Sequence, residues 1–278
     1  MILHFRGEYK NIMKITTLIE NLVYRPDLVS EHGLSLYIDT GRRRIIFDAG
    51  QSDAFLLNSR ILDIDITKAD AMVISHGHYD HTGGLVTFLR QNKHAPVYLK
   101  QHALDKKYNN TMKLIGTSAF PAKYLHRLHF VDEVTEIDDG VFIMPRISVI
   151  NSDDTSFSHF YTDKGEGIVN DEFHDELFLA IIDGGKLSVL SSCSHRGISN
   201  ILAEGQKMFD LPLHLVAGGF HLRGASQEQI DSVFSYISNV NPDKIGICHC
   251  TGVNLYASMA ERFGNKVFYN YTGNVIKI

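Results

Sequence analysis

The sequence predicts a layered α/β fold of the α+β type. Turn residues and apolar alternation predict an opening β-meander at 14–18, 34–39 and 44–48. Strand-like and helix-like patterns then alternate along the chain. Helical spacing of apolar residues occurs at 52–62, 85–91, 198–210, 227–240 and 255–263, with strand-like runs between them at 71–75, 96–99, 213–217 and 244–248. This alternation is typical of sheets whose faces are covered by helices.

The middle of the chain carries further strand patterns and a polar segment. Two strand pairs are predicted, at 177–182 with 187–190 around a Gly-Gly turn and at 141–144 with 147–150. The polar region around Lys106 and Lys107 is predicted to be helix and loop. The stretch 152–176 mixes aromatic and acidic residues, and we expect it to form an active-site loop or lid.

Length and composition favour one large domain. The 278 residues are 44% hydrophobic, which is enough for a sizeable buried core. Residues 13–278 contain no low-complexity linker and are predicted to form a single domain. Residues 1–12 are predicted to be an N-terminal extension, with Met13 as an alternative start. No run approaches the roughly 18 to 20 apolar residues of a membrane span, so no membrane partner is expected.

Charge and cysteine content narrow the class of protein. A formal net charge of −5 does not favour nucleic acid as a partner. The three cysteines, Cys193, Cys248 and Cys250, are too few for a disulfide framework, so a reducing, cytoplasmic location is expected. Cys248 and Cys250 should face away from His249 if the strand continues. We therefore predict that these two are small buried residues rather than ligands.

An H-x-H-x-D-H motif at 76–81 directly follows a strand-like apolar run. Imidazole nitrogen and carboxylate oxygen are ligands that zinc and similar divalent ions prefer. His76 and His78 project to the same side of an extended segment, so both could bind one ion. Asp80 and His81 would then serve a second ion. The motif predicts a metal site.

Histidines also stand where other strands are expected to end. The strand-like runs are followed by turns that carry His76, His195, His221 and His249, three of them with glycine close by. Loops at strand ends converge at one edge of a layered fold, which would bring these side chains together. The role of His221 stays open between ligand, proton shuttle and substrate contact. Six histidines are predicted to lie outside the site: His4, His94, His102, His126, His129 and His214.

Two residues outside the motif, Asp48 and His32, have open interpretations. Asp48 ends a predicted strand, where its carboxylate would orient a ligating imidazole or cap the turn. His32 is assigned equally to the site and to structure. Gly77 is expected to let the backbone turn tightly around the ligands.

Taken together, the motif and the distant histidines His195 and His249 resemble the metallo-β-lactamase superfamily over almost the whole chain. More narrowly, they resemble its branch of 7,8-dihydropterin-6-methyl-4-(β-D-ribofuranosyl)aminobenzene-5′-phosphate synthases. The segments that carry this narrower likeness are 31–35, 47–50, 75–85, 193–198, 218–222 and 249–252.

The resemblance implies a four-layer αββα sandwich with metal at one edge of two sheets. It places His76, His78 and His195 on a first ion and Asp80, His81 and His249 on a second. The expected cofactor is one or two divalent transition metal ions, with zinc first and iron or manganese as alternatives. The superfamily's bridging aspartate is replaced here by Phe220-His221. The second ion would then be held weakly, or His221 would substitute for the carboxylate.

The function expected from these residues is metal-dependent hydrolysis of a phosphate ester or a related small-molecule electrophile. Metal would activate water, Asp80 would orient it or take its proton, and His221 is the other catalytic candidate. Arg196, Arg223, Lys106 and Lys107 are candidates for recognising a phosphate. The branch likeness offers a transferase instead, which joins a dihydropterin methyl pyrophosphate to a ribofuranosylaminobenzene phosphate. A non-enzymatic, metal-stabilised binding protein is the third alternative. The sequence indicates no oligomeric state.

Overall fold

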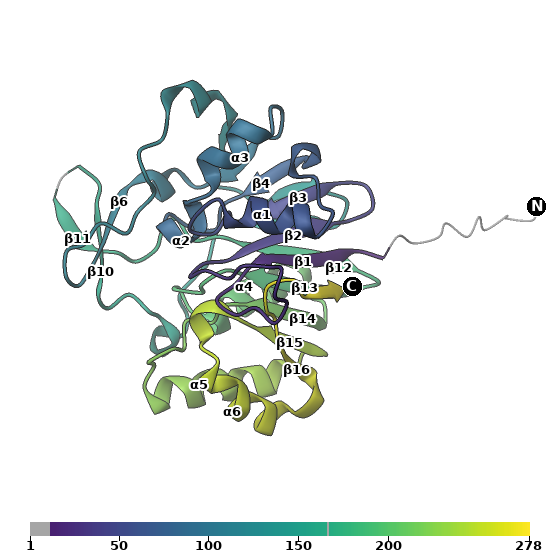
Figure 1. The fold of residues 1–278 in the computed structure, drawn as a ribbon. Helices are drawn as coiled ribbons and strands as arrows, with labels where there is room; N and C mark the ends of the chain where they lie inside the picture. Colours follow the sequence, from purple (N-terminus) through teal and green to yellow (C-terminus); the bar gives the residue numbers. More distant parts are fainter. Residues whose placement is uncertain (1–11, 166) are drawn as a thin grey trace, which may run out of the picture.

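Two seven-stranded sheets pack face to face at the centre of the structure, and helices cover their outer faces (Figure 1). The computed structural model describes residues 12–165 and 167–278. Residues 1–11 of the predicted N-terminal extension lie outside the described residues. The layers confirm the predicted αββα sandwich.

The first sheet holds the opening meander. Its strands β1, β2 and β3 are antiparallel, β17 adds to one edge, and β4, β5 and β7 continue in parallel from β3. The strands in spatial order are β17 (Val275–Lys277), β1 (Lys14–Ile19), β2 (Ser35–Asp39), β3 (Arg44–Phe47), β4 (Ala71–Val73), β5 (Val97–Leu99) and β7 (Leu128–Phe130). The helices α1 (Ala54–Ile61) and α3 (Leu85–Gln91) pack on its outer face, and the short α2 (Tyr79–Thr82) carries part of the ligand motif.

The second sheet is parallel on one side and antiparallel on the other. The predicted hairpin is confirmed as β12 and β13, which pair from Leu179 with Leu190 to Asp183 with Lys186. The spatial order is β16 (Val267–Tyr269), β15 (Lys244–Ile247), β14 (Leu213–Gly218), β13 (Lys186–Ser191), β12 (Phe178–Asp183), β9 (Val141–Met144) and β8 (Thr135–Asp138). The helices α4 (Ile198–Phe209), α5 (Gln227–Val240) and α6 (Asn254–Phe263) cover its outer face (Figure 1).

A third, three-stranded sheet corrects the prediction for the middle of the chain. It orders β11 (Ile168–Asn170), β10 (Phe160–Asp163) and β6 (Lys106–Asn109), and it projects from one end of the sandwich (Figure 1). The region of Lys106 and Lys107 is therefore a strand, and the predicted lid contains two strands. The predicted strand at 147–150 is wrong, because β9 pairs with β8 and β12 instead.

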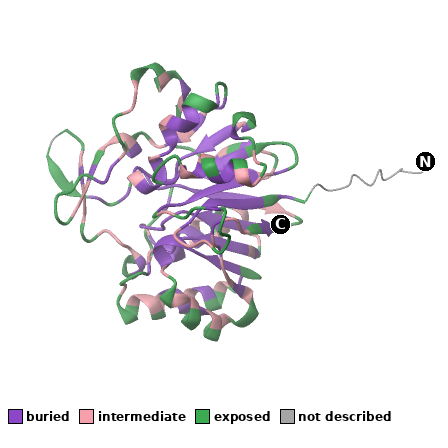
Figure 2. Cartoon of the chain, viewed as in Figure 1, coloured by how far each residue is buried: buried purple, intermediate pink, exposed green. Residues whose placement is uncertain are grey.

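Three apolar clusters separate the layers. One lies between the sheets and includes Phe47 and Leu179, one lies under α1 and α3, and one lies under α4 to α6. The central strands of the two large sheets are buried on both faces, while the helices expose one side (Figure 2). Short 3-10 helices connect the elements at Ile66–Lys68, Gln101–Leu104, Ala122–Arg127, Ser152–Asp154, His249–Thr251 (η5) and Gly264–Lys266. Across the part of the chain that is described, none of the helices is long and apolar enough to cross a bilayer.

A buried lysine ties the small sheet to the sandwich. Lys107 is 1% exposed, and its Nζ lies 2.5 Å from Asp171 Oδ2 and 2.8 Å from Asp175 Oδ1. Asp175 also accepts a 2.7 Å hydrogen bond from the backbone N–H of Gly77. Burial opposes the charge of Lys107, but the two carboxylates raise its pKa above the ordinary value. Lys107, a candidate for recognising a phosphate, is instead paired with two buried carboxylates.

Replacing Lys107 with methionine should destabilise the protein by about 3–5 kcal/mol, because two buried carboxylates lose their counter-charge. Urea denaturation measures the change. Lys106→Met is the matched control: this neighbour in β6 is exposed, so its effect should stay within about 0.5 kcal/mol. Equal losses for the two variants would contradict the assignment.

Candidate metal centre

The loops that follow β4, β13, β14 and β15 meet at one edge of the sandwich. His76 comes from the first sheet, and His195, His221 and His249 come from the second. Ring centroids lie 5.0 Å apart for His76 and His195 and 4.2 Å apart for His195 and His221. The predicted convergence of strand-end histidines is therefore present, and both large sheets contribute to it.

The first candidate ligand group contains His76, His78 and His195. One ring nitrogen from each lies within 4.8 Å of the others, and all three side chains are buried. Nε2 of His76, Nε2 of His78 and both ring nitrogens of His195 lack a hydrogen-bond partner. Buried polar atoms rarely remain unpaired, because leaving them so is costly. A divalent ion fits this group, since it would bind the free nitrogens.

The second group surrounds one oxygen of Asp80. Its Oδ2 lies 3.2 Å from His32 Nε2, 3.5 Å from His81 Nε2 and 3.4 Å from His249 Nε2. The structure thus brings His32, whose role the sequence left open, to the same carboxylate as the predicted second-ion residues. Its assignment as a contact of the metal or substrate stays a prediction.

The charge balance of the site favours a cation. Burial opposes protonation of His81, but Asp80 and Asp48 outweigh it and raise the His81 pKa to about 10. Burial also lowers the His78 pKa to about 3, so that ring stays neutral and keeps a free lone pair. Two carboxylates that can hold an imidazole cationic could equally neutralise a metal ion.

Asp48 links three of the loops. It accepts hydrogen bonds from the Ser75 backbone N–H and hydroxyl, each at 2.7 Å, and lies 2.8 Å from His81 Nδ1. The Ser192 hydroxyl also donates to it. A carboxylate on the far nitrogen of an imidazole fixes the ring and makes it a better ligand. The structure therefore contains the predicted contact between Asp48 and a candidate ligating imidazole. The effect of Asp48 on metal binding stays a prediction.

Two buried glutamates that the sequence did not single out hold the other loops. Glu176 accepts 2.7 Å hydrogen bonds from the backbone N–H groups of His195 and Arg196, and burial raises its pKa to about 7. Glu20 accepts from the backbone N–H of His249 at 2.6 Å and from the Tyr269 hydroxyl at 2.8 Å. Their position was the sequence signal that could have found them. Glu20 directly follows the buried strand β1, and Glu176 lies two residues before the buried strand β12.

The site concentrates unfavourable backbone conformations. Asp48, Ser194, His221 and His249 have φ values of 62°, 58°, 49° and 52°. Each such residue costs about 1–3 kcal/mol, and such strain gathers at functional sites. Gly77 was expected to allow a tight turn, but the structure gives a different reason for glycine. A Cβ at this position would lie 2.3 Å from the backbone oxygen of Ala103, so only glycine lets the two backbone segments approach this closely.

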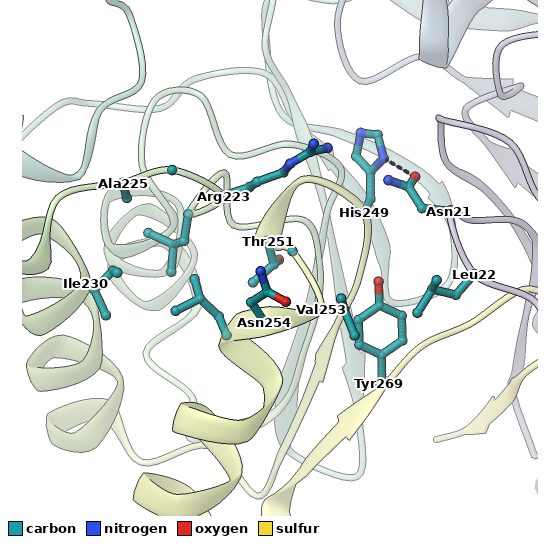
Figure 3. Close-up of a pocket in the computed structure, with 14 residues that line it drawn as sticks. Asn21, Leu22, Arg223, Ala225, Ile230, His249, Thr251, Val253, Asn254 and Tyr269 are labelled. Atoms are coloured by element: carbon teal, nitrogen blue, oxygen red, sulfur yellow. Dashed lines mark hydrogen bonds between the residues drawn. The ribbon is translucent and has the colours of Figure 1, made fainter.

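Two cavities open onto the histidines. A cavity of about 210 Å³ is lined by residues of both ligand groups and by Phe160 of the small sheet. A larger one of about 460 Å³ shares His249 with it and holds Arg223, Asn254 and Tyr269 (Figure 3). The structure does not bring the Arg196 side chain to either. Its guanidinium donates to the backbone oxygens of Ile147 and Glu172, and Arg196 lines a separate cavity.

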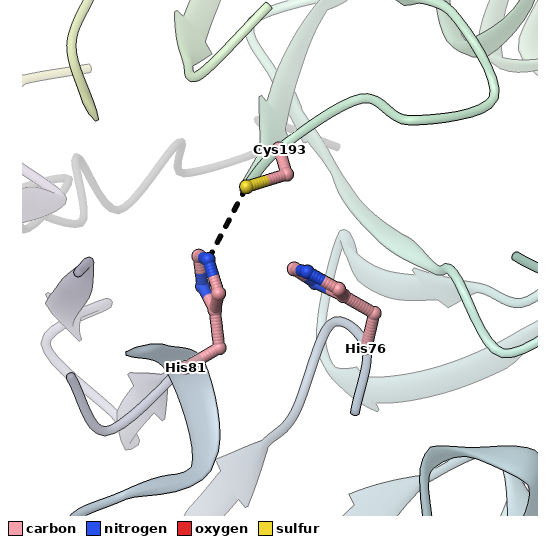
Figure 4. A group of neighbouring side chains, drawn as sticks. All are labelled: His76, His81 and Cys193. Atoms are coloured by element: carbon pink, nitrogen blue, oxygen red, sulfur yellow. Dashed lines mark hydrogen bonds between the residues drawn. The ribbon is translucent and has the colours of Figure 1, made fainter. Parts of the chain in front are cut away.

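Cys248 and Cys250 are both buried, as predicted, but they lie in different surroundings. Cys248 is buried in the cluster between the sheets, as expected. Cys250 instead lines the smaller cavity, because the chain leaves the strand and enters η5 at His249. Cys193 also reaches the site, with its Sγ 3.2 Å from His81 Nε2, and it converges with His76 and His81 (Figure 4).

The comparisons with known proteins agree with this geometry. A family model described as the metallo-β-lactamase superfamily matches residues 31–166. A solved structure, Tm1679, described as a metal-dependent hydrolase of the β-lactamase superfamily, is 31% identical with a TM-score of 0.84 and covers 96% of this chain and 99% of its own. This chain belongs to the metallo-β-lactamase superfamily.

Relatives within the superfamily also span the chain. The 7,8-dihydropterin-6-methyl-4-(β-D-ribofuranosyl)-aminobenzene-5′-phosphate synthase of Methanocaldococcus jannaschii is 29% identical, covering 98% of this chain and 98% of its own. An uncharacterised protein of the same organism is 29% identical and covers 95% of this chain and 100% of its own. The predicted likeness to the superfamily and to the synthase branch is confirmed.

His195→Ala should weaken metal binding by more than about 100-fold, since losing even an outer partner of a ligand costs 10- to 100-fold. Elemental analysis after dialysis against a competing chelator measures the metal retained per chain. His94→Ala is the control, because His94 is exposed and far from the motif in the fold. Full metal retention by His195→Ala would contradict the ligand assignment.

Proposed function

We propose that this member of the superfamily is a metal-dependent hydrolase of a phosphorylated small molecule. The observation that carries the proposal is the group of His76, His78 and His195, with its unpaired buried nitrogens at the wall of a cavity. The likeness to a relative described as a metal-dependent hydrolase supports it.

When bound, a divalent ion supplies positive charge that acidifies water and polarises the substrate. The chain's own residues would then orient the water and the substrate. The neighbouring imidazoles overcome the effect of burial and hold the pKa of Asp80 well below its ordinary value, which suits a carboxylate that orients water by accepting a hydrogen bond. His221 lines the same cavity, and its Nδ1 lacks a partner, which suits proton transfer or a metal contact.

The larger cavity suggests the shape and charge of the substrate. Its walls are mainly apolar and include Leu22, Leu222 and Ile230. Arg223 extends along its rim toward His249 (Figure 3). An apolar or aromatic body in this cavity would leave an anionic group beside the guanidinium, close to the histidines. We therefore propose a phosphate ester of an organic alcohol as the substrate class.

A second candidate is the transferase reaction named for the relative from Methanocaldococcus jannaschii. Its similarity over 98% of both chains is the observation that favours it. The same cavity would accept a ring system, and the same cationic centre would stabilise a departing pyrophosphate. The two candidates differ in whether water or an organic acceptor attacks.

A substrate panel separates the candidates. The protein is loaded in turn with zinc, manganese or iron and assayed on phosphomonoesters, phosphodiesters, nucleotides, thioesters and lactones, with the pterin condensation as a separate assay. We expect hydrolysis of a phosphate ester that depends on His195. Condensation without any hydrolysis would favour the transferase, and a metal-loaded protein inactive in every assay would favour a binding protein.

Arg223→Ala should raise KM for a phosphorylated substrate roughly 10- to 150-fold and leave kcat nearly unchanged, because one charge-assisted hydrogen bond is worth about 1.5–3 kcal/mol. Steady-state kinetics on the active substrate measures the two constants. Arg262→Ala, at the exposed far end of α6, is the control and should change neither. An unchanged KM for Arg223→Ala would exclude this residue from phosphate recognition.

A further inference from the structure

A second cluster of soft ligands lies beside the three histidines. The thiols of Cys193 and Cys250 and one ring nitrogen of His221 all lie within 4.8 Å of one another. Cys250 Sγ lies 3.4 Å from the backbone oxygen of Cys193. Nδ1 of His221 is buried without a partner. Neither the superfamily ligand set expected from the sequence nor the proposed hydrolysis uses the two thiols.

We propose that Cys193, Cys250 and His221 form a thiolate-rich metal site that takes a thiophilic divalent ion such as zinc. Thiolates select such ions over magnesium or calcium. The proposed site requires that the protein binds metal, as proposed above, but it does not depend on which reaction the protein catalyses.

The spacing of the three side chains fits such an ion. Zinc binds cysteine sulfur at about 2.3 Å and histidine nitrogen at about 2.0–2.1 Å in tetrahedral sites, so its ligand atoms lie roughly 3.3–3.8 Å apart. Atoms already within 4.8 Å of one another need only small side-chain rotations to reach that spacing. Three protein ligands leave a fourth position for water or substrate.

The surrounding backbone makes room for the cluster. A Cβ at Gly219 would lie 2.5 Å from Cys250 Sγ, so glycine is the residue that lets the thiol approach. Phe220 is 1% exposed and packs into the cluster under α4 to α6, away from the site. The next residue, His221, has a φ of 49°, and its side chain turns back toward the cavity.

The thiols would also supply negative charge to the site. The resemblance to the superfamily implies a bridging aspartate where this chain has Phe220-His221. A thiolate at Cys193 or Cys250, within 4.8 Å of the His221 ring nitrogen, would supply the negative charge that the aspartate would have carried.

Cys193 connects this site to the histidines. Its Sγ belongs both to the group with His221 and Cys250 and to the group with His76 and His81 (Figure 4). The same sulfur can therefore face two ions, as a bridging ligand does. Cobalt(II) is the probe that separates the sites, because sulfur ligands give a near-ultraviolet charge-transfer absorption that imidazole and carboxylate ligands do not.

The full-length chain, kept reduced and metal-free, is titrated with cobalt(II). We expect the sulfur-to-cobalt absorption in the unaltered protein and in Cys248→Ala, the matched control whose cysteine lies between the sheets. Cys250→Ala should lose at least half of this absorption and one equivalent of cobalt, yet keep the visible bands of cobalt at the histidines. Cys193→Ala should lose the absorption altogether.

Cobalt bound to the unaltered protein without the sulfur absorption would overturn the thiolate site and leave the three-histidine centre standing. An absorption that survives both Cys193→Ala and Cys250→Ala would also overturn it. Failure of the unaltered protein to bind cobalt at all would overturn the proposed metal dependence itself. Circular dichroism of each variant checks that a lost absorption does not come from unfolding.

Discussion

The site depends on buried carboxylates that accept backbone N–H groups from the ligand loops. Asp48 holds the loop after β4, Glu176 the loop after β13, and Glu20 the loop after β15. Asp175 does the same for Gly77, between two candidate ligands. Because these acceptors project from different parts of the sandwich, the core helps to fix the positions of the histidines. Such support keeps ligands close to the geometry that a metal requires.

The same carboxylates give the site its charge. Buried anions are costly unless cations or donors compensate them, and here Lys107 and the imidazoles supply part of that compensation. A divalent ion would supply more. The proposed thiolates of Cys193 and Cys250 belong to the same balance, since each would add negative charge beside the imidazoles. The buried carboxylates, the strained backbone and the candidate metal ligands therefore all lie in the same site.

Periodic patterns predicted much of the fold, including α3 and α5 with the bounds that the structure has. The small sheet escaped prediction because β6 is polar and pairs with β10, about 50 residues later, so no local pattern marks it. The strand-end histidines were predictable from turns, whereas Glu20 and Glu176 act through contacts distant in sequence. Cys250 is buried as predicted, but its orientation could not be derived because strand alternation does not continue into η5.

We propose above that His76, His78 and His195 bind one metal ion. Anomalous diffraction from crystals of the zinc-loaded protein, collected on both sides of the zinc absorption edge, is the direct test. We expect an anomalous peak between the three rings, within about 2.0–2.1 Å of one nitrogen of each. Stoichiometric zinc with its peak elsewhere, and none between these rings, would contradict it.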